Sequence, residues 1–414
     1  MANVAIKTYG CKVNQYESQL LRENLEKSGY LVTDYDDSDI VLVNSCCVTA
    51  RAESEGRRFV RKSVREGRKV WVTGCGAKKE NDYAGIEGVE VFPDKEAFAE
   101  SKLAGIRMIS GFPGRTRAFI KIEDGCENFC SYCIIPYVRG PVVSRDEREI
   151  VLEAKALAAS GYREIVMTGV DLGAYGRDTG KSLVRLLGAV SGIDGLERIR
   201  LSSMEVFHLD EKLVEHISGN RKVCTHFHIP LQSGSDRVLS LMKRRYTLAG
   251  YMEKLEYVRR MIPDVTFTTD LMVAFPGEGE DDFKMSCKAV GDAGFLRVHI
   301  FRYSGRAGTP ACLLDDKVAV KTGKERESVL KSVSEETGNR IKAGFVGREV
   351  EILAESREGN RFEGYTRNYV PSFFLSGEGD INGIFRASGE GLADGRLFCI
   401  GAKEYAGHKG IKDA

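Results

Sequence analysis

The most restrictive feature of this sequence is a short loop with three cysteines, Cys126, Cys130 and Cys133, separated by three and then two residues. Three thiolates this close together can bind three irons of a cubane 4Fe-4S cluster, whereas the chain between them is too short for clean disulfide pairing. Zinc is the alternative, but no second Cys or His pair follows at a suitable spacing. The loop therefore predicts an iron–sulfur site whose fourth iron has no local cysteine.

The loop, with Tyr132 before its last cysteine, resembles the radical S-adenosylmethionine superfamily. The resemblance implies that S-adenosylmethionine chelates the open iron through its amino and carboxylate groups. It also implies that the reduced cluster passes an electron to this cofactor, which is cleaved to methionine and a deoxyadenosyl radical.

Composition and the absence of long apolar runs indicate the compartment and the partners to expect. The N-terminus enters a strand-like pattern without a signal sequence, and no apolar run is long enough to cross a bilayer. We therefore expect a cytoplasmic protein without a membrane partner, whose eleven cysteines stay reduced and favour metal binding over disulfides. Because the net charge is only +1, nucleic acid would have to be bound by local basic patches.

Residues 1–108 alternate between strand and helix patterns, which predicts a doubly wound parallel sheet in an α/β fold. The expected strands are 3–9, 39–44 and 69–73, and the expected helices are 15–27 and 48–65.

Each of these strands runs into a cysteine, namely Cys11, Cys46 and Cys75. The carboxyl ends of parallel strands share one edge, where ligands usually bind, so we expect the three thiols to meet there. This arrangement predicts a second iron–sulfur cluster, and three buried core cysteines are the alternative. Cys47 adjoins Cys46, and because neighbouring side chains alternate, we assign only Cys46 to the cluster.

The two cysteine sets together resemble the methylthiotransferase family. The resemblance implies an auxiliary 4Fe-4S cluster on Cys11, Cys46 and Cys75, which carries a methylated sulfur to the substrate. The motifs that carry it are Gly10-Cys11-Lys12-Val13-Asn14, Asn44-Ser45-Cys46-Cys47-Val48-Thr49, Thr73-Gly74-Cys75, Cys126 to Arg139-Gly140, and Leu231-Gln232-Ser233-Gly234-Ser235.

The stretch from Cys11 to Ser18 is most similar to the branch that acts on threonylcarbamoyladenosine in transfer RNA. The sequence departs from the family pattern at Cys47, usually threonine, and at Gly76, where a larger residue is common. The resemblance implies that a methylthio group is added to C2 of N6-threonylcarbamoyladenosine, which lies 3′ of the anticodon. The extruded base would be bound in a pocket.

Residues 115–335 are expected to form a partial barrel of six β/α units, similar to the radical S-adenosylmethionine core. Its strands are expected at 118–122, 164–168, 198–202, 226–231, 266–273 and 298–303, after a loose connection at 94–117. Side chains at the carboxyl ends of such strands face the reaction site, although a turn or cap role is the alternative for each. The candidate contacts of the cofactor are Tyr132 for its adenine, Gly169 for close approach of the backbone, Asp171 for its amino group, Ser203 and Glu205 for its ribose, and Gln232.

Residues 340–402 change to short strands and glycine-rich turns, which predict a small β-barrel that resembles the TRAM domain. The strands are expected at 349–353, 361–366, 372–375, 384–388 and 396–400, after a linker helix at 321–342. Tyr365, Arg367 and Tyr369 are candidates to clamp an unpaired RNA loop. Two basic clusters, Arg57 to Lys69 and Lys243 to Arg245, could contact phosphates, with a solvated helix face as the alternative.

These features predict an enzyme that is a monomer and that uses two 4Fe-4S clusters and S-adenosylmethionine. Its partners would be the anticodon stem-loop of transfer RNA and an external electron donor. Three alternatives stay open: a methylthiotransferase for isopentenyladenosine in transfer RNA, one for an aspartate of a ribosomal protein, and a non-catalytic two-cluster protein that carries electrons or binds RNA.

Overall fold

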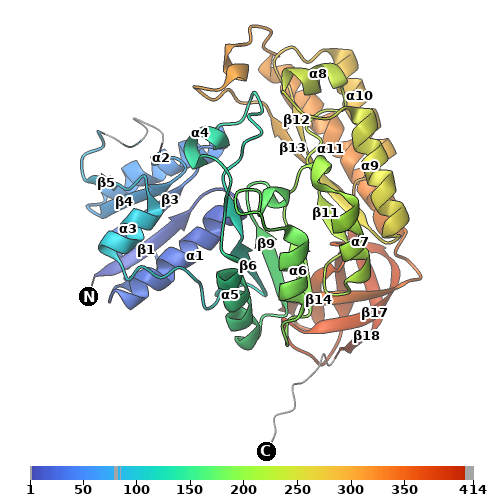
Figure 1. Ribbon diagram of the computed structural model, residues 1–414, viewed down its shortest axis with the longest axis horizontal. Coiled ribbons are helices and arrows are strands. Elements are labelled where there is room, and N and C mark those ends of the chain that lie inside the picture. The colour runs from blue at the N-terminus through green and yellow to red at the C-terminus, as the bar shows by residue number, and fades with distance from the viewer. Residues whose placement is uncertain (1, 79–82, 84, 406–414) are drawn as a thin grey trace, which may run out of the picture.

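The computed structural model describes residues 2–78, 83 and 85–405, and its elements fall into three consecutive regions (Figure 1). A parallel sheet with helices comes first, drawn in blue, followed by a larger group of parallel strands and helices. A closed β-barrel, drawn in red, ends the chain. The predicted fold class is confirmed.

The N-terminal sheet is parallel and has the strand order β2-β1-β3-β4-β5. Its three inner strands are the predicted ones. The edge strands β2 and β5 were missed, because two or three residues carry too little periodicity to show in a sequence. The bounds are β1 (Asn3–Thr8), β2 (Leu31–Val32), β3 (Ile40–Ser45), β4 (Lys69–Gly74) and β5 (Val89–Val91).

Helices cover both faces of this sheet, as a doubly wound fold requires. Along β3, Leu42 packs with Leu25 on one face, whereas Val43 packs with Val60 on the other. The strand is therefore buried throughout. The two helices are α1 (Lys12–Lys27) and α2 (Ala50–Arg65).

The segment 94–117 begins with a helix that was not predicted, whereas residues 103–116, which hold its glycines, have no helix or strand, as expected. Lys95–Lys102 forms helix α3, and Phe98 is buried against Trp71 with ring centroids 5.8 Å apart. Burial of this aromatic ring against the sheet outweighs the weak local pattern.

Six parallel strands form the central region, and they belong to two sheets, β10-β9-β6 and β11-β12-β13. Single bridges at Ile199–Val223 and Ser203–His228 connect the two sheets into one curved layer. Within the described residues β6 and β13 do not pair with each other, so the barrel stays open. The bounds are β6 (Arg117–Lys121), β9 (Glu164–Thr168), β10 (Arg198–Leu201), β11 (His226–His228), β12 (Thr266–Val273) and β13 (Arg297–Arg302).

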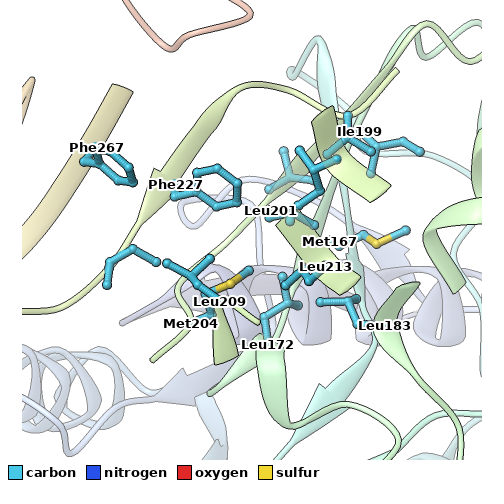
Figure 2. Close-up of a cluster of buried hydrophobic side chains, with 14 of the residues drawn as sticks. Met167, Leu172, Leu183, Ile199, Leu201, Met204, Leu209, Leu213, Phe227 and Phe267 are labelled. Atoms are coloured by element: carbon cyan, nitrogen blue, oxygen red, sulfur yellow. The ribbon is translucent and has the colours of Figure 1, made fainter. Parts of the chain in front are cut away.

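Strand side chains that face the surrounding helices are apolar, among them Met167, Leu201 and Phe227 (Figure 2). Alternate positions carry polar groups such as Thr168 and Arg200, and these face the barrel interior. The helices are α5 (Glu147–Ala159), α6 (Leu183–Ser191), α7 (Glu211–Gly219), α8 (Asp236–Leu241), α9 (Leu248–Met261) and α10 (Glu280–Ala293).

The expected linker helix is α11 (Val320–Ala343), and it is part of the central region. Leu330 is fully buried in the core of that region, and the Ser334 hydroxyl accepts a hydrogen bond from the Val298 amide at 3.1 Å. The helix therefore covers the last strand of the barrel as well as leading to the C-terminal region.

The C-terminal region is a closed barrel with the strand order β14-β15-β16-β18-β17. Its core contains Phe362, Phe374 and Phe385. All five strands were predicted, and several extend beyond the predicted ends. They are β14 (Glu349–Glu358), β15 (Arg361–Thr366), β16 (Pro371–Leu375), β17 (Ile384–Ala393) and β18 (Arg396–Glu404).

The turn after β15 packs on the amino-terminal end of the central barrel. Arg200 Nη2 donates to the Thr366 carbonyl at 3.2 Å, and the Tyr369 ring lies 4.6 Å from the His226 ring. Arg367 Nη2 donates to the Val223 carbonyl at 3.0 Å. The prediction that this turn clamps an RNA loop is therefore wrong, because its side chains attach one barrel to the other.

Candidate active site

The three-cysteine loop lies between β7 (Glu123–Asp124) and the short helix α4 (Ile135–Arg139). Gly125 begins it with φ of +82°, and an added Cβ would lie 1.8 Å from the Pro141 carbonyl oxygen. Farther along, the Ser131 amide and hydroxyl both donate to carbonyls at the end of α8, at 3.0 and 2.7 Å. These contacts fix the loop against the barrel, and only glycine fits its first turn.

Burial controls the protonation of the loop thiols. It raises the pKa of Cys126 and of Cys133 to about 12. Cys130 accepts a hydrogen bond from Arg244 Nη1 at 3.2 Å. Thiolates in such surroundings need a balancing positive charge, which bound iron supplies.

The arrangement of donor groups bears on what this loop can bind. Among the described residues, no three Cys, His, Asp or Glu side chains converge as the ligands of a single metal ion do. A cubane cluster places each thiolate on a different iron, so its ligands surround a volume. Cys130 is buried and Cys126 and Cys133 are partly buried, and the three thiols fit such a cluster.

Arg244 connects the cysteine loop to the end of β10. Its Nη2 donates to Glu205 Oε2, and the side chains of the two residues are 3% and 12% exposed. Sequence analysis grouped Arg244 with the exposed Lys243 as a phosphate contact, and this assignment is corrected by its burial. Glu205 was expected to bind the ribose of the cofactor, whereas here its carboxylate is paired with a guanidinium.

Asp171 follows β9 and lies beside the cysteine loop. Its Oδ2 accepts hydrogen bonds from Asn128 Nδ2 and His208 Nε2, both at 3.1 Å. Burial alone would raise the pKa of Asp171, but the hydrogen bond and charge of His208 hold it below its ordinary value. An anionic carboxylate at this point is compatible with the predicted contact to an amino group.

Gly169 is in close contact with Glu123, a residue that sequence analysis did not single out. A Cβ on Gly169 would lie 1.9 Å from Glu123 Oε1, which accepts a hydrogen bond from the Asp171 amide at 2.7 Å. Burial raises the pKa of Glu123 to about 8, and its Oε2 has no hydrogen-bond partner among the described residues. Only its burial distinguishes this acid, and burial has no signature in a single sequence.

The other predicted cofactor contacts lie around the same edge. Tyr132 packs edge-on against Phe275, with ring centroids 6.5 Å apart. Ser203 forms the bridge between the two central sheets, and Gln232 has φ of +67° and bridges to Leu271. Contact of these three residues with the cofactor stays a prediction.

The second cysteine set assembles as expected, because Cys11, Cys46 and Cys75 follow β1, β3 and β4, which are neighbours in the sheet. Gly10 has φ of +103°, and an added Cβ would lie 2.8 Å from Cys46 Sγ. Burial raises the pKa of Cys46 to about 11 and also raises that of Cys75. Cys46 and Cys75 are therefore in apolar surroundings like those of the first set, whereas Cys11 is exposed.

Two buried asparagines hold the loops that carry these thiols. Asn14 Nδ2 donates to the Tyr9 and Ser45 carbonyls at 2.8 and 3.1 Å, and Asn44 Nδ2 donates to the Asn14 carbonyl at 2.9 Å. The strand ends are thereby tied to the first turn of α1. These asparagines account for the Asn residues of the two N-terminal motifs.

The two cysteine sets face one another across α4. Cys47 and Cys75 belong to one apolar cluster with Ile134, Ile135 and Val138, and Cys126 and Cys133 pack against the same cluster. Cys46 instead contacts Gly10, so the neighbouring thiols have different surroundings, as strand alternation predicts.

Arg139, at the end of the helix that follows the first cysteine loop, bonds a thiol of the second set. Its Nε donates to Cys75 Sγ at 3.1 Å, and Nη2 donates to Asn14 Oδ1 at 2.6 Å. Its Nη1 donates to Glu17 Oε1 at 3.1 Å and Asp124 Oδ1 at 2.7 Å. A residue that follows the first cysteine loop by six positions thus bonds a thiol of the second set. Sequence analysis had noted it only as part of a motif.

The basic cluster on α2 remains at the surface. Arg57, Arg58, Arg61 and Arg65 line an open hollow of about 750 Å³ together with Gly85 and Ile86. Contact with phosphates stays a prediction for this patch.

Comparisons with known proteins agree with this architecture. The Radical SAM superfamily matches residues 120–290, and Uncharacterized protein family UPF0004 matches residues 3–90. A search of the described helices found none that is long and apolar enough to cross a membrane.

Curated relatives span nearly the whole chain. The threonylcarbamoyladenosine tRNA methylthiotransferase MtaB of Thermotoga maritima is 38% identical over 86% of this chain and 87% of that protein. The MtaB protein of Bacillus subtilis is 32% identical over 93% of each. The tRNA-2-methylthio-N(6)-dimethylallyladenosine synthase of Pelotomaculum thermopropionicum is also 32% identical, over 86% of this chain and 88% of its own.

Among solved structures, the radical S-adenosylmethionine methyltransferase TsrM of Kitasatospora setae superposes with a TM-score of 0.56. The two chains are 16% identical, and the match covers 76% of this chain and 77% of that one. At this identity the likeness shows the shared fold alone.

Proposed function

Because this chain belongs to the radical S-adenosylmethionine methylthiotransferase family, we propose that it adds a methylthio group to C2 of N6-threonylcarbamoyladenosine in transfer RNA. The modified base lies 3′ of the anticodon, so the anticodon stem-loop is the proposed partner. The chain would act as a monomer with an external electron donor.

The observation that carries the proposal is the meeting of thiols from both sets at α4, with Arg139 bonded to one of them. Cys126, Cys130 and Cys133 would hold one 4Fe-4S cluster, and Cys11, Cys46 and Cys75 would hold a second. When bound, these groups supply the electron that cleaves S-adenosylmethionine and the sulfur that the substrate receives. A substrate base between them would be within reach of both.

The surrounding residues have distinct tasks in this proposal. Asp171, held anionic by His208, would accept from the amino group of S-adenosylmethionine. Arg244 would orient Cys130 and keep Glu205 in place. The apolar surface of Ile134, Ile135 and other cluster residues would exclude water, which protects a reactive radical.

A second candidate substrate is dimethylallyladenosine in transfer RNA. It is favoured by the relative of that name, whose 32% identity equals that of the Bacillus subtilis MtaB protein. The dimethylallyl group is an uncharged hydrocarbon, whereas the threonylcarbamoyl group ends in a carboxylate. The two substrates therefore need different side chains around N6.

The test is mass spectrometry of transfer RNA nucleosides from a host that lacks its own methylthiotransferases and expresses this chain. We expect the methylthio derivative of threonylcarbamoyladenosine, and we expect it to disappear in the Cys11→Ala and Cys126→Ala variants. Cys287→Ala, which removes a partly buried thiol far from both sets in sequence, is the matched control and should keep the product.

Other outcomes select other functions. A methylthio derivative of dimethylallyladenosine would keep the chemistry and change the substrate. If no nucleoside is modified although the protein is folded and loaded with iron, a peptide assay would test the ribosomal-protein substrate. Failure to cleave S-adenosylmethionine after reduction would indicate a non-catalytic protein.

A further inference from the structure

Lys12 reaches from the N-terminal region into the central barrel. It follows Cys11 directly and begins α1, yet its Nζ lies 3.3 Å from the Ser202 hydroxyl at the carboxyl end of β10. Ser202 in turn contacts Thr168 at the end of β9, with 3.4 Å between the hydroxyl oxygens. The side chain of Lys12 therefore extends from the residue next to Cys11 to the carboxyl end of β10, beside Ser203.

This ammonium group differs from the other cations of the junction. Lys121 bonds Glu17 and Asp124, Arg139 bonds the same two acids, and Arg244 bonds Glu205. Within the described part of the chain Lys12 forms no ion pair, and its ammonium group donates a hydrogen bond to a neutral hydroxyl. A partly buried cation with a hydroxyl as its partner has an unused capacity to bind an anion.

The nearby carboxylate and histidines do not supply that anion. The Asp270 carboxylate already accepts from His228 Nε2 at 3.2 Å. Burial and neighbouring cations, Lys12 among them, lower the pKa of His226 and His299, so both rings are neutral at physiological pH. The Arg117 and Arg200 guanidinium groups, which are close enough to act on Lys12, add positive charge. The Tyr369 phenol is the nearby acidic group, and although burial opposes it, Arg117 and Lys12 lower its pKa. Arg117 and Arg200 compete with Lys12 for this phenol, so it does not replace a carboxylate partner.

We infer that Lys12 binds the carboxylate of the threonylcarbamoyl group and so selects this substrate over one with an uncharged N6 substituent. The inference rests on the proposed function and adds a residue to it. Lys12 adjoins Cys11, so its ammonium lies within one side-chain length of the thiol set that would deliver sulfur to C2. N6 is attached to the same adenine ring as C2. The threonylcarbamoyl group on N6 carries the carboxylate a few bonds away from that ring.

A merely structural role is the competing explanation, because the hydrogen bond to Ser202 also connects two regions. The two explanations differ in how they treat the substrate. A connecting residue affects every substrate alike, whereas a carboxylate-binding residue affects only those that carry the carboxylate.

The test uses the full-length, iron-loaded enzyme and three anticodon stem-loop RNAs. Their adenosine carries threonylcarbamoyl, the same group with its carboxylate changed to a carboxamide, or dimethylallyl. The enzymes are the wild type, Lys12→Met, Lys12→Arg and the control Lys27→Met, which changes an exposed lysine at the other end of α1. Product formation gives kcat/KM for each pair, and iron content and deoxyadenosine formation report on folding.

We expect Lys12→Met to lower kcat/KM for the threonylcarbamoyl RNA by roughly 10- to 100-fold, the range of a charge-assisted hydrogen bond. For the carboxamide RNA the wild type and Lys12→Met should be equal. Lys12→Arg should recover part of the loss, and Lys27→Met should behave as the wild type.

An equal loss on both RNAs, or no loss on either, would overturn the inference and leave the proposed function intact. If the wild type modifies no threonylcarbamoyl RNA but modifies the dimethylallyl RNA, the proposed function fails and the inference fails with it.

Discussion

The two cysteine sets reach the same junction by different routes. In the central region three thiols come from one eight-residue loop, so their proximity is a local property of the chain. In the N-terminal region the thiols are 35 and 29 positions apart and meet only because three strands are neighbours in a parallel sheet. The first site depends on its loop, whereas the second depends on a whole domain.

This difference suggests a division of labour that variants can separate. The central loop would act on S-adenosylmethionine in any case, because its partners Arg244 and Asp171 belong to the central region. The N-terminal set would serve only the delivery of sulfur. The connection between the two sets is Arg139.

The largest effect is expected from loss of a thiol. Cys126→Ala should abolish both deoxyadenosine formation and the methylthio product, because the cofactor can no longer be cleaved. Cys11→Ala should abolish the product alone and keep deoxyadenosine formation in the reduced enzyme. Chromatography of the reaction mixture measures both compounds, and a Cys11→Ala enzyme that makes no deoxyadenosine would disprove the division of labour.

The next largest effect is expected from the glycines that permit each site. Gly10→Ala should remove iron from the N-terminal set only, because a methyl group would occupy space 2.8 Å from Cys46 Sγ. Strain at positive φ adds about 1–3 kcal/mol to the cost. Iron analysis in the Cys126→Ala background measures this loss.

Gly67→Ala is the matched control for Gly10→Ala. Its φ is +77°, but no heavy atom lies within 4 Å of an added Cβ. It should therefore show the strain without the loss of iron. Equal iron in Gly10→Ala and Gly67→Ala would contradict the packing around Cys46.

A smaller effect is expected from Arg139→Met. The variant should lower methylthio transfer by about 10- to 100-fold, the range found when an outer partner of a metal ligand is removed. Deoxyadenosine formation should stay near the wild-type rate, and the electron paramagnetic resonance signal of the N-terminal cluster should shift. An unchanged signal with both activities reduced alike would indicate a role in folding only.

The smallest effect concerns the pH dependence of stability at Glu123. Its pKa is raised to about 8 from an ordinary 4.5 by burial, so folding favours its protonated form. The contribution of Glu123 to the free energy of unfolding is fully present below pH 4.5 and is lost as pH rises through 8. Glu123→Gln should remove this dependence and raise the unfolding free energy at pH 7, on the order of 1–3 kcal/mol.

Denaturant unfolding at several pH values measures the effect at Glu123. The control is Glu87→Gln, which changes an exposed acid in the N-terminal region and should leave the pH profile unchanged. If the difference in unfolding free energy between the wild type and Glu123→Gln stayed constant between pH 4.5 and 8, this result would contradict the buried environment of the acid.

The comparison also shows what a sequence can reveal. The cysteine spacing and the strand-to-cysteine pattern are periodic or local signals, and they predicted the three inner strands of the N-terminal sheet and the thiols that follow them. Arg139, Arg244 and Glu123 escaped prediction, because their importance arises from burial and from partners distant in sequence. The turn with Tyr369 was predicted to bind an RNA loop because its aromatic residues were taken as exposed. Exposed aromatic residues and buried ones look alike in a sequence.

The segment 94–117 gives the same lesson for the fold. Its glycines indicated a loose connection, which is correct for residues 103–116, yet Phe98 packs against Trp71 and a helix forms around it at 95–102. Tertiary packing decided a case in which the local pattern was weak.

The most direct test of the central claim, that both thiol sets serve one reaction chamber, is electron paramagnetic resonance of the doubly reduced protein. Two paramagnetic clusters at one junction should couple, so the spectrum should show splitting or broadening beyond the sum of the Cys11→Ala and Cys126→Ala spectra. A spectrum that equals that sum would place the clusters too far apart and contradict the account.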